Sequence, residues 1–257
     1  MSMEQYQSLI SQIVPTATYL MLYLQGEPFL NPNIFAMIKL AHESKMYSCI
    51  STNGHFLDKQ QAIKTVASGL DRIIISLDGV TNEVYQQYRR GGNLATVLEG
   101  ITNLVEAKKS LKSQKPFIIL QFIVFKHNQH QVNEFKTLSH SLGVNKAALK
   151  TAQLYDFEGG HPMMTDLDQF SRYQKSGDHF VLRKSIWNSC KRIWTTGVIT
   201  SDGIMAPCCY DKASTFAMGN VDDKSLEIAW KGQLFNRYRR KILTNRSEID
   251  ICCNCDE

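Results

Sequence analysis

Several features are missing from this chain of 257 residues, and each absence excludes a class of protein. No stretch approaches the roughly 18–20 consecutive apolar residues of a membrane span. The start lacks the basic segment and apolar run of a secretory signal. The net charge of +5 is mild, and the basic run from Arg237 to Lys241 is explained by a solvated helix face. We therefore expect a cytoplasmic globular protein with no membrane or nucleic-acid partner.

Cysteine is scarce in most of the chain. Upstream of residue 190 only Cys49 occurs, within a predicted strand, where a small buried core residue is expected. The other six of the seven cysteines follow from Cys190 onward. In a reducing compartment, clustered cysteines more often bind metal than form disulfides. The chain thus divides into a cysteine-poor front and a cysteine-rich end.

The front of the chain alternates short β-rich runs with longer helical patterns. Five strands are predicted, at 19–24, 46–51, 72–77, 116–126 and 144–150, with helices at 31–44, 58–68, 81–88, 94–110 and 129–142. Each connection between strands is long enough for a βαβ unit, so the sheet should be parallel. The fold class is therefore α/β.

The rest of the chain follows a different pattern. Residues 152–185 lack a clear period and are interpreted as a linker with one helix at most. A β-hairpin is predicted around 201–203, and a helix over 225–241. The predicted domains are a core at 1–151, the linker at 152–185 and a small α+β cysteine-rich domain at 186–257. So small a domain needs a metal to stabilise it.

Polar residues gather where three of the predicted strands end. These compact motifs are Gly26-Glu27, Ser51 to Gly54 and Ser76 to Gly79. Parallel strands place active-site loops at their carboxyl ends. Strand ends also need polar turns, so one such motif would mean little. Three of them together predict a binding site at this edge of the sheet.

Four cysteines form the predicted metal site: Cys190, Cys208, Cys252 and Cys255. Four thiolates are the usual ligand number for a 4Fe–4S cluster. Cys209 and Cys253 are treated as spare, because adjacent residues of an extended chain point to opposite faces. Tetrahedral zinc fits the same donors, and unliganded buried thiols are a third reading.

The motifs together resemble the radical S-adenosylmethionine (SAM) enzymes with a C-terminal SPASM domain. In the front they are Gln25 to Pro32, Ser51 to Gly54, Ser76 to Gly79 and Arg89 to Gly92. In the tail they are the Cys190, Gly203 and Cys208 spacing, the Gly219-Asn220 pair and the stretch from Ser225 to Trp230. The resemblance covers nearly the whole chain, and it favours iron–sulfur over zinc.

This resemblance implies a partial (β/α)6 TIM-like barrel that lacks its first strand, with an auxiliary 4Fe–4S cluster in the tail. It also implies that SAM binds at the strand ends, with Glu27 receiving its amino group and Arg89 its carboxylate. The implied cofactor-binding residues are Gly26, Glu27, Pro28, Ser51, Asn53, Ser76, Asp78 and Arg89. No catalytic residue can be named.

One family feature is missing from the sequence. Such enzymes hold their catalytic cluster with Cys-x3-Cys-x2-Cys, and this motif occurs nowhere in the 257 residues. The chain is therefore interpreted as an N-terminally incomplete member that does not cleave SAM by itself. The expected activity is radical modification of a peptide or small molecule.

The alternative is a non-catalytic module that binds a peptide or partner and has a structural iron–sulfur or zinc site. A partner chain or a second copy would cover the exposed edge at 19–24, because an open strand edge favours pairing.

Overall fold

The structure is a computed structural model that describes residues 1–222 and 225–255. Its contacts divide the chain into two compact units. The sheet unit is Thr18–Val181, and the cysteine unit combines Met1–Ala17 with Leu182–Glu257. No helix among the described residues is long and apolar enough to cross a lipid bilayer.

The sheet unit is built on five parallel strands in the order β1-β2-β3-β4-β5. The strands are β1 Tyr19–Met21, β2 Tyr47–Thr52, β3 Arg72–Ser76, β4 Phe117–Val124 and β5 Lys146–Thr151. The predicted parallel α/β sheet is confirmed, and each strand lies within or close to its predicted range. The first strand is shorter than predicted and ends at Met21, which leaves Gly26 and Glu27 in a loop.

Five α-helices connect or follow these strands: α2 Ile34–Glu43, α3 Lys59–Ala67, α4 Asn82–Tyr88, α5 Leu94–Ser110 and α6 Val132–Ser141. Two short 3-10 helices, η1 Pro28–Leu30 and η2 Gln129–Gln131, precede α2 and α6. Asp58, Thr81 and Asn93 cap α3, α4 and α5 with side-chain oxygens. The helix predicted from residue 31 begins at Ile34 instead, with Asn33 at its N-cap position, because Asn31 ends η1.

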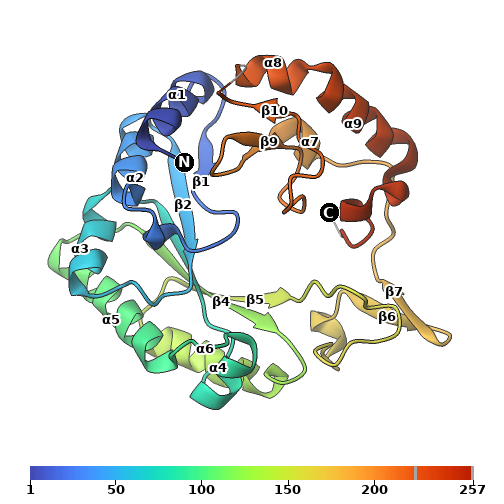
Figure 1. The fold of residues 1–257 in the computed structure, drawn as a ribbon. Helices are drawn as coiled ribbons and strands as arrows, with labels where there is room; N and C mark the ends of the chain where they lie inside the picture. Colours follow the sequence, from blue (N-terminus) through green and yellow to red (C-terminus); the bar gives the residue numbers. More distant parts are fainter. Residues whose placement is uncertain (223–224, 256–257) are drawn as a thin grey trace. The chain divides into compact units, whose positions relative to one another are not determined.

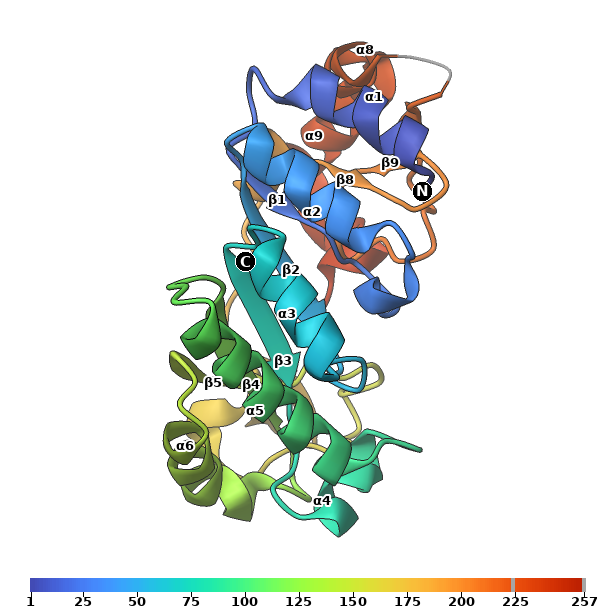
Figure 2. The same cartoon turned by 90° about the vertical axis from the view of Figure 1, so that its left-hand side faces the viewer.

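The sheet has one covered face and one inner face. Figures 1 and 2 show α2, α3, α5 and α6 along the same side of the sheet. The covered face packs Ile50, Ile75, Leu120 and Phe122 into the main core. Side chains alternate along a strand, so the inner face carries a different set: Tyr47, Cys49, Ser51, Arg72, Ser76 and Gln121. The polar strand-end residues therefore lie where the helices do not cover them.

The segment predicted as a linker contains strands. A 3-10 helix η3 at Asp168–Phe170 precedes a two-stranded sheet of β6 Tyr173–Ser176 and β7 His179–Leu182. The Tyr173 hydroxyl donates to the Leu154 carbonyl at 3.0 Å and accepts from the Leu154 N–H at 2.7 Å. Residues up to Val181 thus belong to the sheet unit rather than to a separate connection.

The cysteine unit includes the first helix of the chain, α1 Met3–Ile13, which Ser2 and Gln5 cap reciprocally. Gln5 Nε2 donates to Asp222 Oδ2 at 2.7 Å, and Gln12 Oε1 accepts from the Leu226 N–H at 2.9 Å. These bonds explain why α1 groups with the C-terminal residues rather than with the predicted 1–151 core. Residues 223–224 and 256–257 of the predicted 186–257 domain lie outside the described residues.

The rest of the cysteine unit has little regular structure. A short helix α7 Arg192–Thr195 precedes three small strands, β8 Val198–Ile199, β9 Ile204–Ala206 and β10 Gly219–Asn220. The predicted hairpin is present as the antiparallel pair β8 and β9. Two further 3-10 helices, η4 Arg246–Glu248 and η5 Asp250–Cys252, follow near the end of the chain.

The helix predicted over 225–241 is divided into two. They are α8 Leu226–Lys231 and α9 Gln233–Asn245, and Gly232 separates them with an extended backbone. A Cβ at Gly232 would lie 2.9 Å from the Ile228 carbonyl, so the chain turns there on a residue without a side chain. The sequence analysis predicted one continuous helix because a single glycine such as Gly232 is tolerated within a helical pattern.

Candidate cofactor-binding and metal sites

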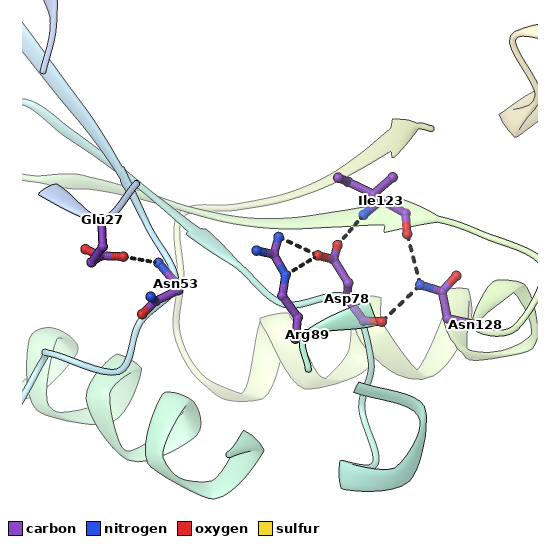
Figure 3. Close-up of polar contacts among 6 residues, drawn as sticks. All are labelled: Glu27, Asn53, Asp78, Arg89, Ile123 and Asn128. Atoms are coloured by element: carbon purple, nitrogen blue, oxygen red, sulfur yellow. Dashed lines mark hydrogen bonds and ion pairs between the residues drawn. The ribbon is translucent and has the colours of Figure 1, made fainter. Parts of the chain in front are cut away.

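Glu27 joins the loop after β1 to the end of β2 (Figure 3). Its Oε2 accepts from the Asn53 N–H at 2.8 Å, and its Oε1 accepts from Thr52 Oγ1 at 2.8 Å. Oε1 also accepts from the Phe29 N–H at 3.2 Å, which makes Glu27 the cap of η1. Among the described residues Oε2 has one donor, so it keeps a lone pair that can accept from an ammonium group.

The residues beside Glu27 leave room for a ligand. Gly26 has a φ of +77°, a conformation that favours glycine. No described atom outside its chain neighbours lies within 4 Å of where its Cβ would be. Pro28 is buried as the first residue of η1. The motif therefore combines a fixed carboxylate with open space on the Gly26 side.

The predicted residues on β2 and at the end of β3 have different surroundings. Asn53 Oδ1 accepts from the His55 N–H at 2.9 Å and lies 3.1 Å from His55 Nδ1. This oxygen therefore stabilises the local turn between Asn53 and His55. Ser51 and Ser76 are both on the inner face, where Ser76 lies opposite Gln121. These positions stay predictions for cofactor contact.

Asp78 and Arg89 were expected to face the cofactor separately, and the structure pairs them with each other (Figure 3). Arg89 donates to Asp78 Oδ2 through Nε at 2.7 Å and Nη2 at 2.6 Å. Asp78 is fully buried, and its Oδ1 accepts from the Ile123 N–H at 2.6 Å. Burial raises the pKa of the Asp78 carboxyl, although Arg89 opposes this effect. The pair leaves Arg89 Nη1 without a hydrogen bond to any described residue.

Asn128 completes this network, and the sequence analysis missed it. Its Nδ2 donates to the carbonyls of Asp78 at 3.0 Å and Ile123 at 2.9 Å, and its Oδ1 accepts from the Phe125 N–H at 2.7 Å (Figure 3). Asn128 is fully buried and joins the ends of β3 and β4. The end of β4 carries polar residues like the other strand ends, and this signal could have identified it.

His127 is a second residue that the sequence analysis missed. Its ring stacks on Phe125 with 5.5 Å between ring centres. Its buried Nε2 has no hydrogen-bond partner among the described residues. Burial lowers the pKa of His127, although the Asp78 carboxylate opposes this. A neutral imidazole therefore lies close to the Asp78 and Arg89 pair.

The four predicted metal ligands all lie in the cysteine unit. Cys190 and Cys252 pack in one apolar cluster with Tyr238, and Cys252 and Cys255 are both buried. Cys208 lies close enough to Cys255 for their charges to interact, and the Tyr210 N–H donates to its sulfur. Within residues 1–222 and 225–255, no three His, Cys, Asp or Glu side chains are arranged to hold a metal ion. The ligand set stays a prediction.

The spare cysteines have other partners. Cys253 is exposed, and its Sγ donates to the Ser247 carbonyl at 3.1 Å. Arg192 Nη1 donates to Cys209 Sγ at 3.5 Å.

The surroundings of the predicted ligands fit a group that binds thiolates. A hydrogen bond with Cys209 and burial raise the pKa of Cys208, and burial raises that of Cys252. Both are therefore thiols in the free protein and must lose protons to bind a metal. Four cysteines in one unit, two of them buried, and an N–H directed at one sulfur are a donor set of the kind that an iron–sulfur cluster uses.

Comparison with protein families gives two matches in the order predicted. A model described as the radical SAM superfamily matches residues 1–132, which is half of the chain. A model described as an iron–sulfur cluster-binding domain, SPASM, matches residues 190–256. The second range contains all four predicted ligands.

Two curated relatives have similar sequences. The tungsten-containing aldehyde ferredoxin oxidoreductase cofactor-modifying protein of Pyrococcus furiosus is 25% identical over 90% of this chain and 71% of its own length. A GTP 3',8-cyclase of Sulfurovum is 26% identical over 79% of this chain and 69% of its own length.

Solved structures of Streptococcus suis SuiB have a similar fold. The structure bound to S-adenosylmethionine matches with a TM-score of 0.69 at 13% identity, over 98% of this chain and 64% of SuiB. The structure bound to the precursor peptide SuiA matches with a TM-score of 0.67. At this identity the match supports the partial barrel fold alone.

Proposed function

Because the chain belongs to the radical SAM superfamily, we propose that it is part of an enzyme that modifies a peptide or small molecule by SAM-dependent radical chemistry. One electron from an iron–sulfur cluster would cleave the sulfonium bond of SAM to give methionine and a carbon radical, and this radical would abstract a hydrogen atom from the substrate. The sheet unit would bind SAM, and residues 190–256 would hold an auxiliary 4Fe–4S cluster. The cluster would serve as a redox partner, a substrate anchor or a structural support.

The main support is the row of polar groups at the carboxyl ends of the strands. Glu27 offers a fixed anionic oxygen, and Arg89 offers Nη1 on a guanidinium that Asp78 holds in place. The methionine part of SAM carries an ammonium and a carboxylate, so these two side chains match its charges. The proposed SAM-binding set keeps the predicted Gly26, Glu27, Pro28, Ser51, Asn53, Ser76 and Arg89. The buried Asp78 acts instead by holding the Arg89 guanidinium in place.

The substrate class has support from both kinds of relative. Two curated relatives have names that describe a cofactor-modifying protein and a GTP cyclase, which suggests a small molecule. SuiB is bound to a precursor peptide in one structure, which suggests a peptide.

SAM binding is tested by calorimetry on Glu27→Ala and Arg89→Ala, with the exposed Glu99→Ala as a control. We expect each of the first two changes to weaken binding about tenfold or more, which is about 1.4 kcal/mol. Glu99→Ala should bind as the wild type does. Equal affinity in all four proteins would contradict the proposed site.

We also propose that the 257-residue chain alone does not cleave SAM, since it has no Cys-x3-Cys-x2-Cys. The chain, reconstituted with iron and sulfide and supplied with dithionite and SAM, should form no 5′-deoxyadenosine. Formation of 5′-deoxyadenosine would refute this statement but would not contradict the proposed SAM-binding site.

A second candidate function is supported by the edge of the sheet. In the described structure β1 pairs only with β2, and Tyr19 and Met21 are 43% and 48% exposed. A module that binds a partner strand would use such an edge. Light scattering on the purified chain, with and without Met21→Lys, tests this: a complex that only the wild type forms would support it, and a monomer in both would count against it.

A further inference from the structure

Arg246 is a buried arginine on η4, between the segment before Cys190 and the last cysteines. It is only 2% exposed. Its Nη1 donates to the Ser189 carbonyl at 2.6 Å and to the Trp187 carbonyl at 3.4 Å. Its N–H donates to Asn188 Oδ1 at 3.0 Å. Arg246 therefore holds the three residues that lead into Cys190.

The Arg246 guanidinium also interacts with the predicted ligands. It hydrogen-bonds Cys252, and its charge interacts with Cys255 and Cys190. One buried positive charge thus faces three of the four predicted ligands.

Another buried arginine in the cysteine unit provides a comparison. Arg239 is 5% exposed, and its guanidinium lies 4.1 Å from the centre of the Phe235 ring and 4.5 Å from that of Trp230. Burial lowers the pKa of Arg239, and no cysteine contributes. An arginine can therefore be buried in this unit without interacting with the predicted ligand sulfurs.

A fixed positive charge beside an iron–sulfur cluster has a definite electronic effect. Reduction adds one negative charge to the cluster, and a nearby buried cation stabilises that charge. Hydrogen bonds to the cysteine sulfurs act in the same direction. A cation at this position therefore raises the reduction potential of the cluster.

We propose that Arg246 is the positioning and tuning residue of the iron–sulfur site. It holds the segment before Cys190 against the segment of Cys252 and Cys255, and its charge makes the cluster easier to reduce. This inference rests on the proposed cluster in residues 190–256. It does not depend on SAM binding or on the substrate.

The test uses the full chain, reconstituted anaerobically with ferrous iron and sulfide. The cluster is titrated with dithionite, and its reduction is followed by electron paramagnetic resonance. In Arg246→Gln we expect the ratio of reduced to oxidised cluster at a fixed potential to fall about tenfold, a shift of about 59 mV to lower potential. Arg246→Lys keeps the charge and should retain most of the wild-type potential.

Two controls separate the charge from general packing. Arg240→Gln removes an exposed charge from the same unit and should change neither stability nor potential. Arg239→Gln removes a buried one and should lower the thermal midpoint while the potential stays unchanged.

Three results would overturn the inference. They are an unchanged potential in Arg246→Gln, an equal shift in Arg239→Gln, and loss of the cluster from both Arg246 variants. If Arg246→Gln loses its iron, retention by Arg246→Lys at the wild-type potential would support the charge as the cause. Failure of the wild type to bind iron and sulfide would instead refute the proposed cluster.

Discussion

The sheet unit and the cysteine unit hold their candidate sites by different means. In the sheet unit, five strands bury a large apolar core, and Glu27, Asp78 and Asn128 are fixed at the strand ends by hydrogen bonds to the backbone. In the cysteine unit, short strands and helices surround a small core that includes Cys252 itself. The residues of the first candidate site are held by hydrogen bonds of the fold, whereas the second, as proposed, would need an inorganic centre to complete it.

The sharpest test of this difference is to remove one predicted ligand. Cys208→Ala and Cys255→Ala should each lose most of the bound iron and unfold the cysteine unit locally, because metal binding in small metal-stabilised folds contributes on the order of 10 kcal/mol. Hydrogen exchange should rise in residues 190–255 and stay unchanged in the sheet unit. The matched changes Cys209→Ala and Cys253→Ala should keep the iron. Wild-type iron content in both ligand variants would contradict the assignment.

The sheet unit should instead depend on its hydrogen bonds. Asn128→Ala leaves the Asp78 and Ile123 carbonyls and the Phe125 N–H without their partner. Each unsatisfied buried group costs about 1–3 kcal/mol, so we expect the free energy of unfolding to fall by about 3 kcal/mol or more. Urea unfolding measures this, with the exposed Asn133→Ala as the control. Equal midpoints for the two variants would show that the strand ends do not need this bridge.

A smaller effect is expected at Glu27. Glu27→Gln keeps one acceptor oxygen but removes the charge that strengthens the bonds to Asn53 and Thr52. We expect Glu27→Gln to lower the free energy of unfolding by about 1–2 kcal/mol. The exposed control Glu99→Gln should leave it unchanged. Iron content of the cysteine unit should stay the same. A change in iron content would weaken the distinction between the two units.

The smallest effect concerns pH. Burial lowers the pKa of His127, so the unfolded chain takes up this proton at higher pH than the folded chain. The contribution of neutral His127 is present above the ordinary pKa of about 6.5 and is lost as the pH falls through the lowered value. His127→Phe should therefore lose less stability on acidification than the wild type. Parallel stability curves for both proteins, with His140→Phe as the exposed control, would exclude this contribution.

The sheet could be predicted because its signals are repeated. Runs such as Arg72–Ser76 and Phe117–Val124 are apolar and β-branched, and capping residues such as Asp58 and Thr81 mark the helices between them. The cysteine spacing likewise pointed to the residues that the SPASM model matches. These features lie within short stretches of sequence.

Long-range side-chain contacts could not be predicted in this way. The pairing of Asp78 with Arg89, the bridge by Asn128 and the burial of Arg246 each depend on the three-dimensional fold. The grouping of α1 with the C-terminal residues depends on contacts between Gln5 and Asp222, which are far apart in sequence. No local pattern identifies such partners.

The most direct test of the account is an iron, sulfide and zinc count on the anaerobically reconstituted chain, with Mössbauer spectra to identify the cluster. The account predicts about four iron and four sulfide per chain, held by Cys190, Cys208, Cys252 and Cys255. About one zinc with no sulfide, or iron that survives in Cys208→Ala and Cys255→Ala, would contradict it.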